Sequence, residues 1–287
     1  MKYCTLAFYN QRIRRGQPIT NLILISLVEV KRLFTTRRGL IALLAFALLW
    51  ALMLRYLIHP SPGWLASDGR GHLLASLLFS GRLNALLRWE LPELSVLWLT
   101  ALYLFPMLTL VLAADQTTSD RLRGTLRVLS LHSNRASLFL GRFTGQLLCQ
   151  FILVCAALAS VTVVIMIRDV ALLSTVMKSL PVILCNIMLV ILPYTALMAL
   201  LSLFAKSARQ ATVLAVIVWI VMTILISWLH SRFAQLPAET GLIIPGAQIP
   251  LLLQYNDWQS LRLAFIPIVQ TAVLLLIGYG VFSRSDL

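Results

Sequence analysis

The residue types that perform most enzyme chemistry are few in this chain and lie far apart. The four histidines lie in different segments. One of the four cysteines precedes the apolar runs and three lie within them, so these residues offer neither the spacing of metal ligands nor a disulfide framework. The sequence contains no Gly-x-x-x-x-Gly-Lys-Ser/Thr phosphate loop, no His-Glu-x-x-His pair and no Gly-x-Ser-x-Gly turn. We therefore expect no catalytic residue, no metal site and no nucleotide site of the phosphate-loop type in this chain.

One stretch combines cationic, polar and apolar residues at a spacing that could bind a partner. Residues 115–142 read DQTTSDRLRGTLRVLSLHSNRASLFLGR. Leu122, Leu126 and Leu129 recur at i, i+4 and i+7, so they share one face of a short helix, and arginines project elsewhere. The hydroxyl and carboxylate side chains that precede them are suited to cap that helix. The alternative is a basic loop that touches anionic lipid.

Six apolar runs must position this stretch. The chain has 287 residues, of which 60% are hydrophobic and 12% are charged, whereas a soluble domain has about 25% charged residues. Runs of about 20 apolar residues are the length of a membrane-spanning helix, and they do not alternate as barrel strands would. We predict an all-α polytopic membrane protein that forms a single transmembrane domain. Its spans cover residues 39–58, 93–114, 145–167, 181–205, 211–229 and 263–282.

Charge sets the orientation of these spans. Lys and Arg number 24 against 10 Asp and Glu, a formal net charge of +14. With six spans, 16 of the 24 basic residues lie on the side that holds both termini, 7 lie on the other side, and Arg55 lies in the first span. The positive-inside rule places both termini in the cytoplasm of a multi-pass inner-membrane protein. Because topology explains the basicity, we expect membrane lipids rather than nucleic acid as partners.

Three segments outside the spans carry apolar residues. Residues 18–38 predict a helix that lies in the membrane interface, with its stripe on Ile19, Leu22, Ile23, Val30, Leu33 and Phe34. Residues 59–92 predict a short helix on the outer surface, because leucines recur there at helical spacing. Residues 230–262 are rich in Pro and Gly yet apolar, which indicates an outer segment that partly re-enters the membrane.

Fragments in three of these places resemble the permease subunits of type-2 ABC exporters, the ABC-2 family. Gly124-Thr125-Leu126 and Leu140-Gly141-Arg142 are similar to the family's cytoplasmic signature. Val28-Glu29-Val30-Lys31-Arg32-Leu33 resembles its interfacial helix, and Arg284-Ser285-Asp286-Leu287 resembles its common ending. The six-span plan with both termini inside covers the whole chain.

The chain departs from the family pattern at three points. The turn His132-Ser133-Asn134-Arg135 lacks a proline, and Arg142 stands where the family has lysine. The acidic residue of the signature is either Asp115 or Asp120. These departures concern the register of the signature within the loop.

The resemblance implies a division of labour between subunits. A separate ATPase, present in two copies, would bind ATP and Mg²⁺, so this chain would be no enzyme and would need no cofactor of its own. Two permease chains would pair as a homodimer or a heterodimer. The loop at 115–142 would dock on the ATPase. The residues expected to make that contact are Asp120, Arg121, Leu122, Gly124, Thr125, Leu126, Arg127, Leu129 and Arg135.

Polar side chains within the spans indicate a pathway, because such residues tend to face a bundle interior. In the family the second and fifth helices line the route at the dimer interface. The corresponding expectation here is Thr100, Tyr103, Met107, Trp219, Met222 and Thr223. Ordinary helix packing is the alternative for all six. Their apolar and aromatic character favours an amphiphile, lipid or peptide over a small ion.

Other classes of function remain open from the sequence. A secondary transporter or channel usually carries charges or paired broken helices at the middle of the membrane, and these spans contain almost no charge. An intramembrane enzyme lacks its catalytic groups here. A membrane scaffold that recruits an ATPase without transport would share the same loop, and reconstituted transport would separate it from an exporter.

Overall fold

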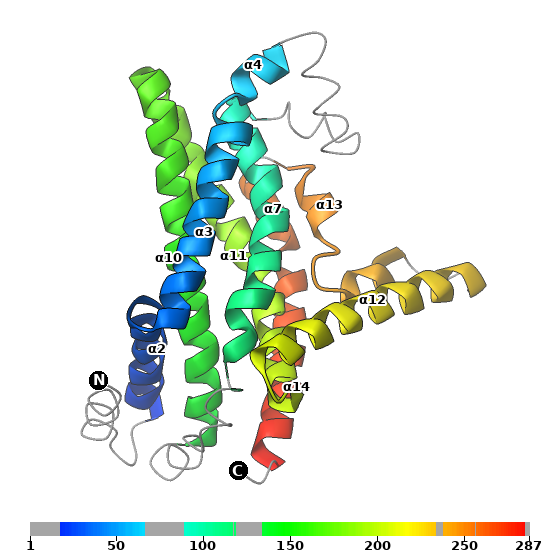
Figure 1. Ribbon diagram of the computed structural model, residues 1–287. Coiled ribbons are helices and arrows are strands. Elements are labelled where there is room, and N and C mark those ends of the chain that lie inside the picture. Colours follow the sequence, from blue (N-terminus) through cyan, green and yellow to red (C-terminus); the bar gives the residue numbers. More distant parts are fainter. Residues whose placement is uncertain are drawn as a thin grey trace.

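Helices make up every regular element in the part of the chain that the computed structural model describes, residues 18–66, 89–116, 118, 134–233, 238–255 and 257–284 (Figure 1). Six helical segments in these ranges are long and apolar enough to cross a membrane, which confirms the predicted all-α polytopic fold. They are Gly39–Gly63, Pro92–Asp115, Arg135–Arg168, Val170–Phe204, Ala208–Arg232 and Trp258–Arg284.

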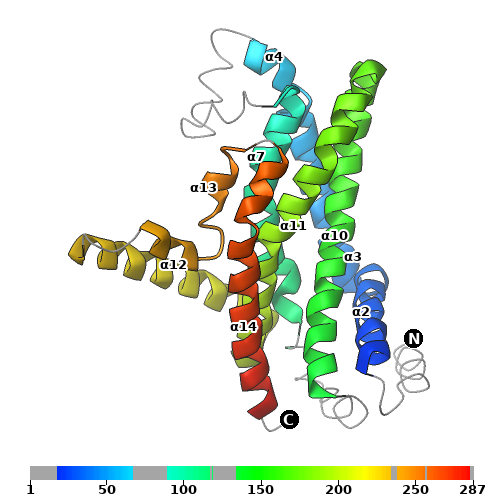
Figure 2. The same cartoon turned by 180° about the vertical axis from the view of Figure 1, so that it is seen from behind.

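Two helices form the centre of the bundle, α7 (Pro92–Leu112) and α11 (Leu173–Phe204). Their side chains supply about half of the main core, with α3 (Arg37–Met53), α10 (Arg135–Arg168) and α14 (Phe265–Arg284) packed around them (Figures 1 and 2). Both α10 and α11 begin before the apolar runs that predict them, which start at residues 145 and 181. Leu138 and Phe139 of α10 and Val176 of α11 are buried, so these first turns are packed parts of the helices.

Among the described residues, an ion pair joins α10 to α7 at the end of the bundle away from the chain termini (Figure 1). Arg168, at the last turn of α10, pairs with Glu93 in the first turn of α7. Glu93 is only 1% exposed, so its charge depends on this partner and on the positive end of its own helix. After α3 come a π-helical turn, η1 (Leu54–Ile58), and a short helix, α4 (Ser61–Ala66). The surface helix predicted within 59–92 lies mainly outside the described residues.

The outer segment before the last helix folds back onto the bundle. It consists of η4 (Ala238–Ile243), α13 (Ile249–Leu252) and η5 (Trp258–Leu263). Ile249 and Leu252 are buried in the main core, and the Tyr194 hydroxyl of α11 donates to the Pro245 carbonyl at 3.0 Å. Gly246 adopts φ +88°, and a Cβ there would collide with that hydroxyl. The irregular backbone is thus packed on the bundle around Gln248, Ile249 and Leu252, whereas Ile243 and Trp258 are exposed.

One long helix leaves the bundle. After its first turns, α12 (Ala208–Arg232) runs obliquely away from the other spans (Figure 1). Its buried residues are Ala211 and Ala215, and the Thr212 hydroxyl donates to the Leu110 carbonyl of α7 at 3.4 Å. The rest of α12 exposes large apolar side chains such as Ile224, which is suited to contact with lipid or a second chain.

The interfacial helix α2 (Pro18–Thr35) packs along the start of α10. Its buried face carries Asn21, Ile25 and Ser26. This face lies beside the apolar stripe that the sequence predicts, and Ile23 and Phe34 of that stripe are exposed. The close approach depends on Gly141 and Gly145 of α10, because a Cβ at Gly145 would lie 2.9 Å from the Glu29 Cβ and 3.0 Å from the Ser26 Cα. A small residue every four positions permits this kind of helix contact.

A sharp elbow joins α2 to α3. Thr36 has extended backbone, with φ −90° and ψ 146°, and caps α3 by accepting from the Gly39 amide at 3.1 Å. Its hydroxyl also donates to the Arg32 carbonyl at 2.9 Å, so one side chain serves the end of one helix and the start of the next. Gly39 is required at the elbow, since a Cβ there would collide with the Leu33 carbonyl. The first span therefore starts in a fixed direction relative to α2.

These contacts predict that Gly145→Leu separates α2 from α10. We expect the substitution to lower the free energy of unfolding by about 1–3 kcal/mol, the usual cost of overpacking. The measurement is thermal unfolding of the purified chain in detergent. The matched control is Gly280→Leu in α14, where an added Cβ meets no atom within 4 Å. Equal melting temperatures for the two variants would show that the α2–α10 contact is not close.

Candidate functional site

A cluster of polar side chains surrounds the points where the loop between α7 and α10 leaves the bundle and returns to it. The loop follows η2 (Ala113–Asp115), which continues α7, and it ends at Asn134, which caps α10. Of the predicted coupling residues, Arg135 lies within the described part of the chain. Asp120, Arg121, Leu122, Gly124, Thr125, Leu126, Arg127 and Leu129 lie outside the described residues.

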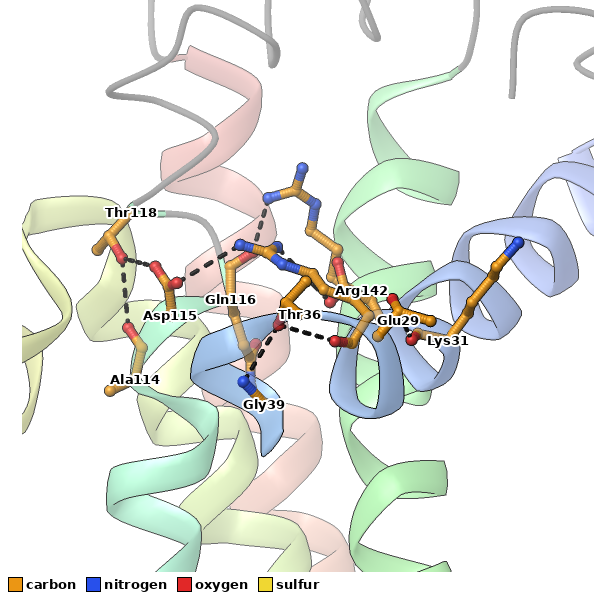
Figure 3. A network of polar contacts seen from close by, with 11 residues as sticks. Glu29, Lys31, Thr36, Gly39, Ala114, Asp115, Gln116, Thr118 and Arg142 are labelled. Atoms are coloured by element: carbon orange, nitrogen blue, oxygen red, sulfur yellow. Dashed lines mark hydrogen bonds and ion pairs between the residues drawn. The ribbon is translucent and has the colours of Figure 1, made fainter. Parts of the chain in front are cut away.

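Asp115 is held from two sides where the loop begins. The Thr118 hydroxyl donates to its Oδ1 at 2.7 Å, and Arg32 Nη2 of α2 lies 3.4 Å from its Oδ2 (Figure 3). Arg32 also lies 3.8 Å from Glu29 on the same helix. Both partners of the Arg32–Asp115 pair are about three-quarters buried, so water screens this pair less than it would a surface pair. The ion pair ties the interfacial helix to the start of the loop.

Arg142 caps the end of the second span. Its Nη1 donates to the Gln116 carbonyl at 2.6 Å, and the residue is only 3% exposed (Figure 3). The last carbonyls of a helix lack partners within the helix and carry partial negative charge, so a guanidinium there satisfies an acceptor and complements the dipole. A charge buried to this degree needs such partners. The arginine therefore connects α10 rigidly to the point where the loop leaves α7.

The cluster continues into the membrane through neutral groups. Gln116 Nε2 lies 3.4 Å from the Thr195 carbonyl of α11, and the Thr195 hydroxyl donates to Gln150 Oε1 of α10 at 2.9 Å. Gln116, Thr195 and Gln150 are each at most 5% exposed. A buried, hydrogen-bonded polar network fixes the relative position of the helices that it joins. Here it joins the end of α7 to α10 and α11.

Arg135 performs a similar task at the other end of the loop. Its Nη1 donates to the Ser283 carbonyl in the last turn of α14 at 2.5 Å. The predicted coupling role for this residue stays a prediction, since its observed contact is within the chain. Two arginines of α10 thus bind the carboxyl ends of other spanning helices, Arg142 at the end of α7 and Arg135 at the end of α14.

A second set of contacts attaches α2 to α10 just below this cluster. The Ser26 hydroxyl lies 3.0 Å from the Gly141 carbonyl and 2.6 Å from the Thr144 hydroxyl. Gly141 is directly next to Arg142, so the helix that carries the cap is also the helix on which α2 rests. Movement of the loop at Asp115 or Gln116 would consequently reach α2, α10 and α11 together.

The predicted pathway residues occupy two exposed stripes. On α7, Tyr103 and Met107 are 40% and 56% exposed, whereas the Thr100 hydroxyl donates back to the Val96 carbonyl at 2.6 Å. On α12, Trp219 and Thr223 are exposed and Met222 is half-buried. The stripes do not meet within one chain, because α12 has left α7 beyond its first turns (Figure 1). A route lined by these six residues stays a prediction.

Sequence reasoning missed most of the described cluster. The sequence placed Arg142, Arg32 and Asp115 in fragments that resemble the family. It gave no indication that these residues bind one another or the ends of helices. Gln150 and Thr195 lie in apolar runs, and a polar residue in such a run signals a buried partner. Within the described ranges, no three His, Cys, Asp or Glu side chains gather in a way that could hold a metal ion.

Comparison with known proteins gives one family. A family model described as "ABC-2 family transporter protein" matches residues 23–287. That range includes all six spans, α2 from Ile23 onward and the loop between α7 and α10. No curated protein matches the chain.

The arrangement predicts that Arg142→Met loosens the root of the loop. Loss of a buried, charged hydrogen bond should lower the free energy of unfolding by about 2 kcal/mol. Trypsin should also cut the loop faster, because the Gln116 carbonyl loses its donor. The measurements are thermal unfolding in detergent and limited proteolysis of inside-out vesicles.

The control for this prediction is Arg232→Met, which removes an exposed arginine from the far end of α12. If Arg142→Met and Arg232→Met melt and are cleaved alike, the cap does not hold the loop.

Proposed function

Because the chain belongs to the ABC-2 family of transporter proteins, we propose that it is the membrane-spanning permease subunit of an ATP-driven exporter. The observation that carries the proposal is the extent of the family match, which covers residues 23–287 and hence the whole membrane bundle. The sequence has no phosphate loop, so ATP and Mg²⁺ bind to a separate ATPase subunit, of which two copies serve two permease chains.

The cytoplasmic loop is the contact with that ATPase. Closure of the ATPase moves the loop, and the loop is joined at its roots to four spanning helices and to α2. Asp115 and Gln116 transmit the movement to α2, α10 and α11, and Arg135 transmits it to α14. A rigid attachment of this kind lets one docking site bias the whole bundle between an inward-open and an outward-open state.

The second permease chain contacts the exposed stripes on α7 and α12. Both carry large apolar or aromatic side chains on the surface, among them Tyr103, Met107 and Trp219. Residues of this type are suited to an interface between chains and to passage of an amphiphile. The two chains lie in the inner membrane with all four termini in the cytoplasm, in agreement with the distribution of basic residues.

Binding of the ATPase tests the proposal. Gly124 and Leu126 are both changed to Asp, which places two negative charges in the loop segment expected to dock. We expect the double variant to retain at least tenfold less of the ATPase encoded beside it. The reason is that each lost apolar contact costs roughly 1–2 kcal/mol of binding free energy. The measurement is the amount of ATPase retained on the affinity-tagged permease after detergent extraction.

The control is Thr35→Asp, a charge at an exposed cytoplasmic position on α2. Both variants must elute as folded protein in gel filtration. Undiminished binding of the ATPase to the folded Gly124→Asp/Leu126→Asp chain would contradict coupling through the loop. A third outcome is that the double variant loses binding as expected but the wild-type permease and ATPase show no ATP-dependent transport in liposomes. That outcome would indicate a scaffold and not an exporter.

A further inference from the structure

An open groove lies at the junction between the fourth and fifth spans. The α11 helix ends at Phe204 and α12 begins at Ala208, and the groove beside this turn has a volume of about 390 Å³. That volume is within the range of small-molecule sites in proteins. The lining residues are Phe204, Ala205, Arg209, Gln210, Val213, Leu214 and Ile217.

The wall of the groove is apolar along its length and cationic at one end. Val213, Leu214 and Ile217 follow Arg209 at intervals of about one and two helical turns, so they extend the groove along α12. Val213 and Ile217 are about half exposed, and Phe204 is 59% exposed. Arg209 and Lys206 lie at the start of α12, on the cytoplasmic side by the distribution of basic residues.

These two cations lack an acidic partner among the described residues. The ion pairs within the described ranges use Arg32 with Glu29 and Asp115, and Arg168 with Glu93. Lys206 and Arg209 are exposed, and no described carboxylate lies within ion-pair distance of either. The amino end of α12, capped by Ser207, adds partial positive charge at the same place. The groove therefore pairs an apolar wall with one cation in its lining, Arg209, and a second cation, Lys206, lies next to the lining residue Ala205 in the sequence.

We propose that this groove binds an anionic phospholipid of the cytoplasmic leaflet. Its phosphate group lies against Lys206 and Arg209, and one hydrocarbon chain lies along Val213, Leu214 and Ile217. Charge complementarity selects an anionic ligand, because basic side chains at this surface attract anionic headgroups. The apolar wall selects one with a hydrocarbon chain over a free inorganic anion.

The site is on a different face of α12 from the proposed contact with a second chain. At about 100° per residue, Gln210, Val213, Leu214 and Ile217 lie roughly opposite Trp219, Met222 and Thr223. Pairing of two permeases through the Trp219 stripe therefore leaves the groove open to the membrane. A bound lipid would support the first turns of α12, whose buried side chains in one chain are Ala211 and Ala215.

Lipid binding by the purified full-length chain tests the proposal. The probe is fluorescent phosphatidylglycerol, titrated in detergent and displaced by unlabelled phosphatidylglycerol, phosphatidylcholine or inorganic phosphate. The wild-type chain should bind the probe saturably, and the dissociation constant should rise roughly tenfold to thirtyfold in Lys206→Gln/Arg209→Gln. Each basic residue contributes about 1 kcal/mol of binding free energy. Val213→Trp, which fills the groove without changing charge, should weaken it comparably.

The matched control is Arg232→Gln/Arg262→Gln, which removes two exposed cations on the outer side and should leave binding unchanged. The proposal is overturned if the groove variants bind phosphatidylglycerol as the wild type does, or if phosphatidylcholine or phosphate displaces the probe equally well. It is also overturned if Val213→Trp shifts the balance of monomer and dimer in mass photometry, since the groove would then belong to an interface between chains.

Discussion

The carbonyls at the end of a spanning helix lack partners within the helix, and the hydrocarbon core supplies no water to satisfy them. In this chain two arginines at one end of the bundle meet that demand. Arg142 donates to the Gln116 carbonyl where α7 ends, and Arg135 donates to the Ser283 carbonyl where α14 ends. Both arginines belong to the first turns of α10, so a single helix holds the carboxyl ends of two others.

The same first turns of α10 carry the interfacial helix. Gly141 and Gly145 let α2 approach so closely that a Cβ atom at either glycine would collide with α2. The Ser26 hydroxyl of α2 binds the Gly141 carbonyl. At the opposite end of α10, Arg168 pairs with the buried Glu93 of α7. Helices α7 and α10 are thus fixed to each other at both membrane boundaries, whereas α12 has buried side chains only at its start. A bundle built in this way can transmit movement from the loop through its rigid part and change shape mainly at α12.

Composition and apolar spacing were sufficient for the architecture, because the length of an apolar run follows directly from the thickness of the bilayer. They placed six spans and the interfacial helix close to where the structure has them. They could not show that α10 and α11 begin about ten residues earlier, since Ser137, Arg142 and Lys178 are polar and their helical state depends on tertiary packing. The cluster was equally hidden: Arg142 and Gln116 are 26 positions apart, and only the fold brings a guanidinium to that carbonyl.

The most direct test follows the movement of the bundle in the assembled transporter. Spin labels at Thr35 and Ser231, exposed residues at the end of α2 and near the far end of α12, report the distance between the rigid part of the bundle and α12 in liposomes with the ATPase bound. The account predicts that ATP with vanadate shifts the distance in the wild type, and that the shift is lost in Arg142→Met while the ATPase stays bound. An equal shift in Arg142→Met, or no shift in the wild type during ATP turnover, would contradict coupling through the arginine-capped roots of the loop.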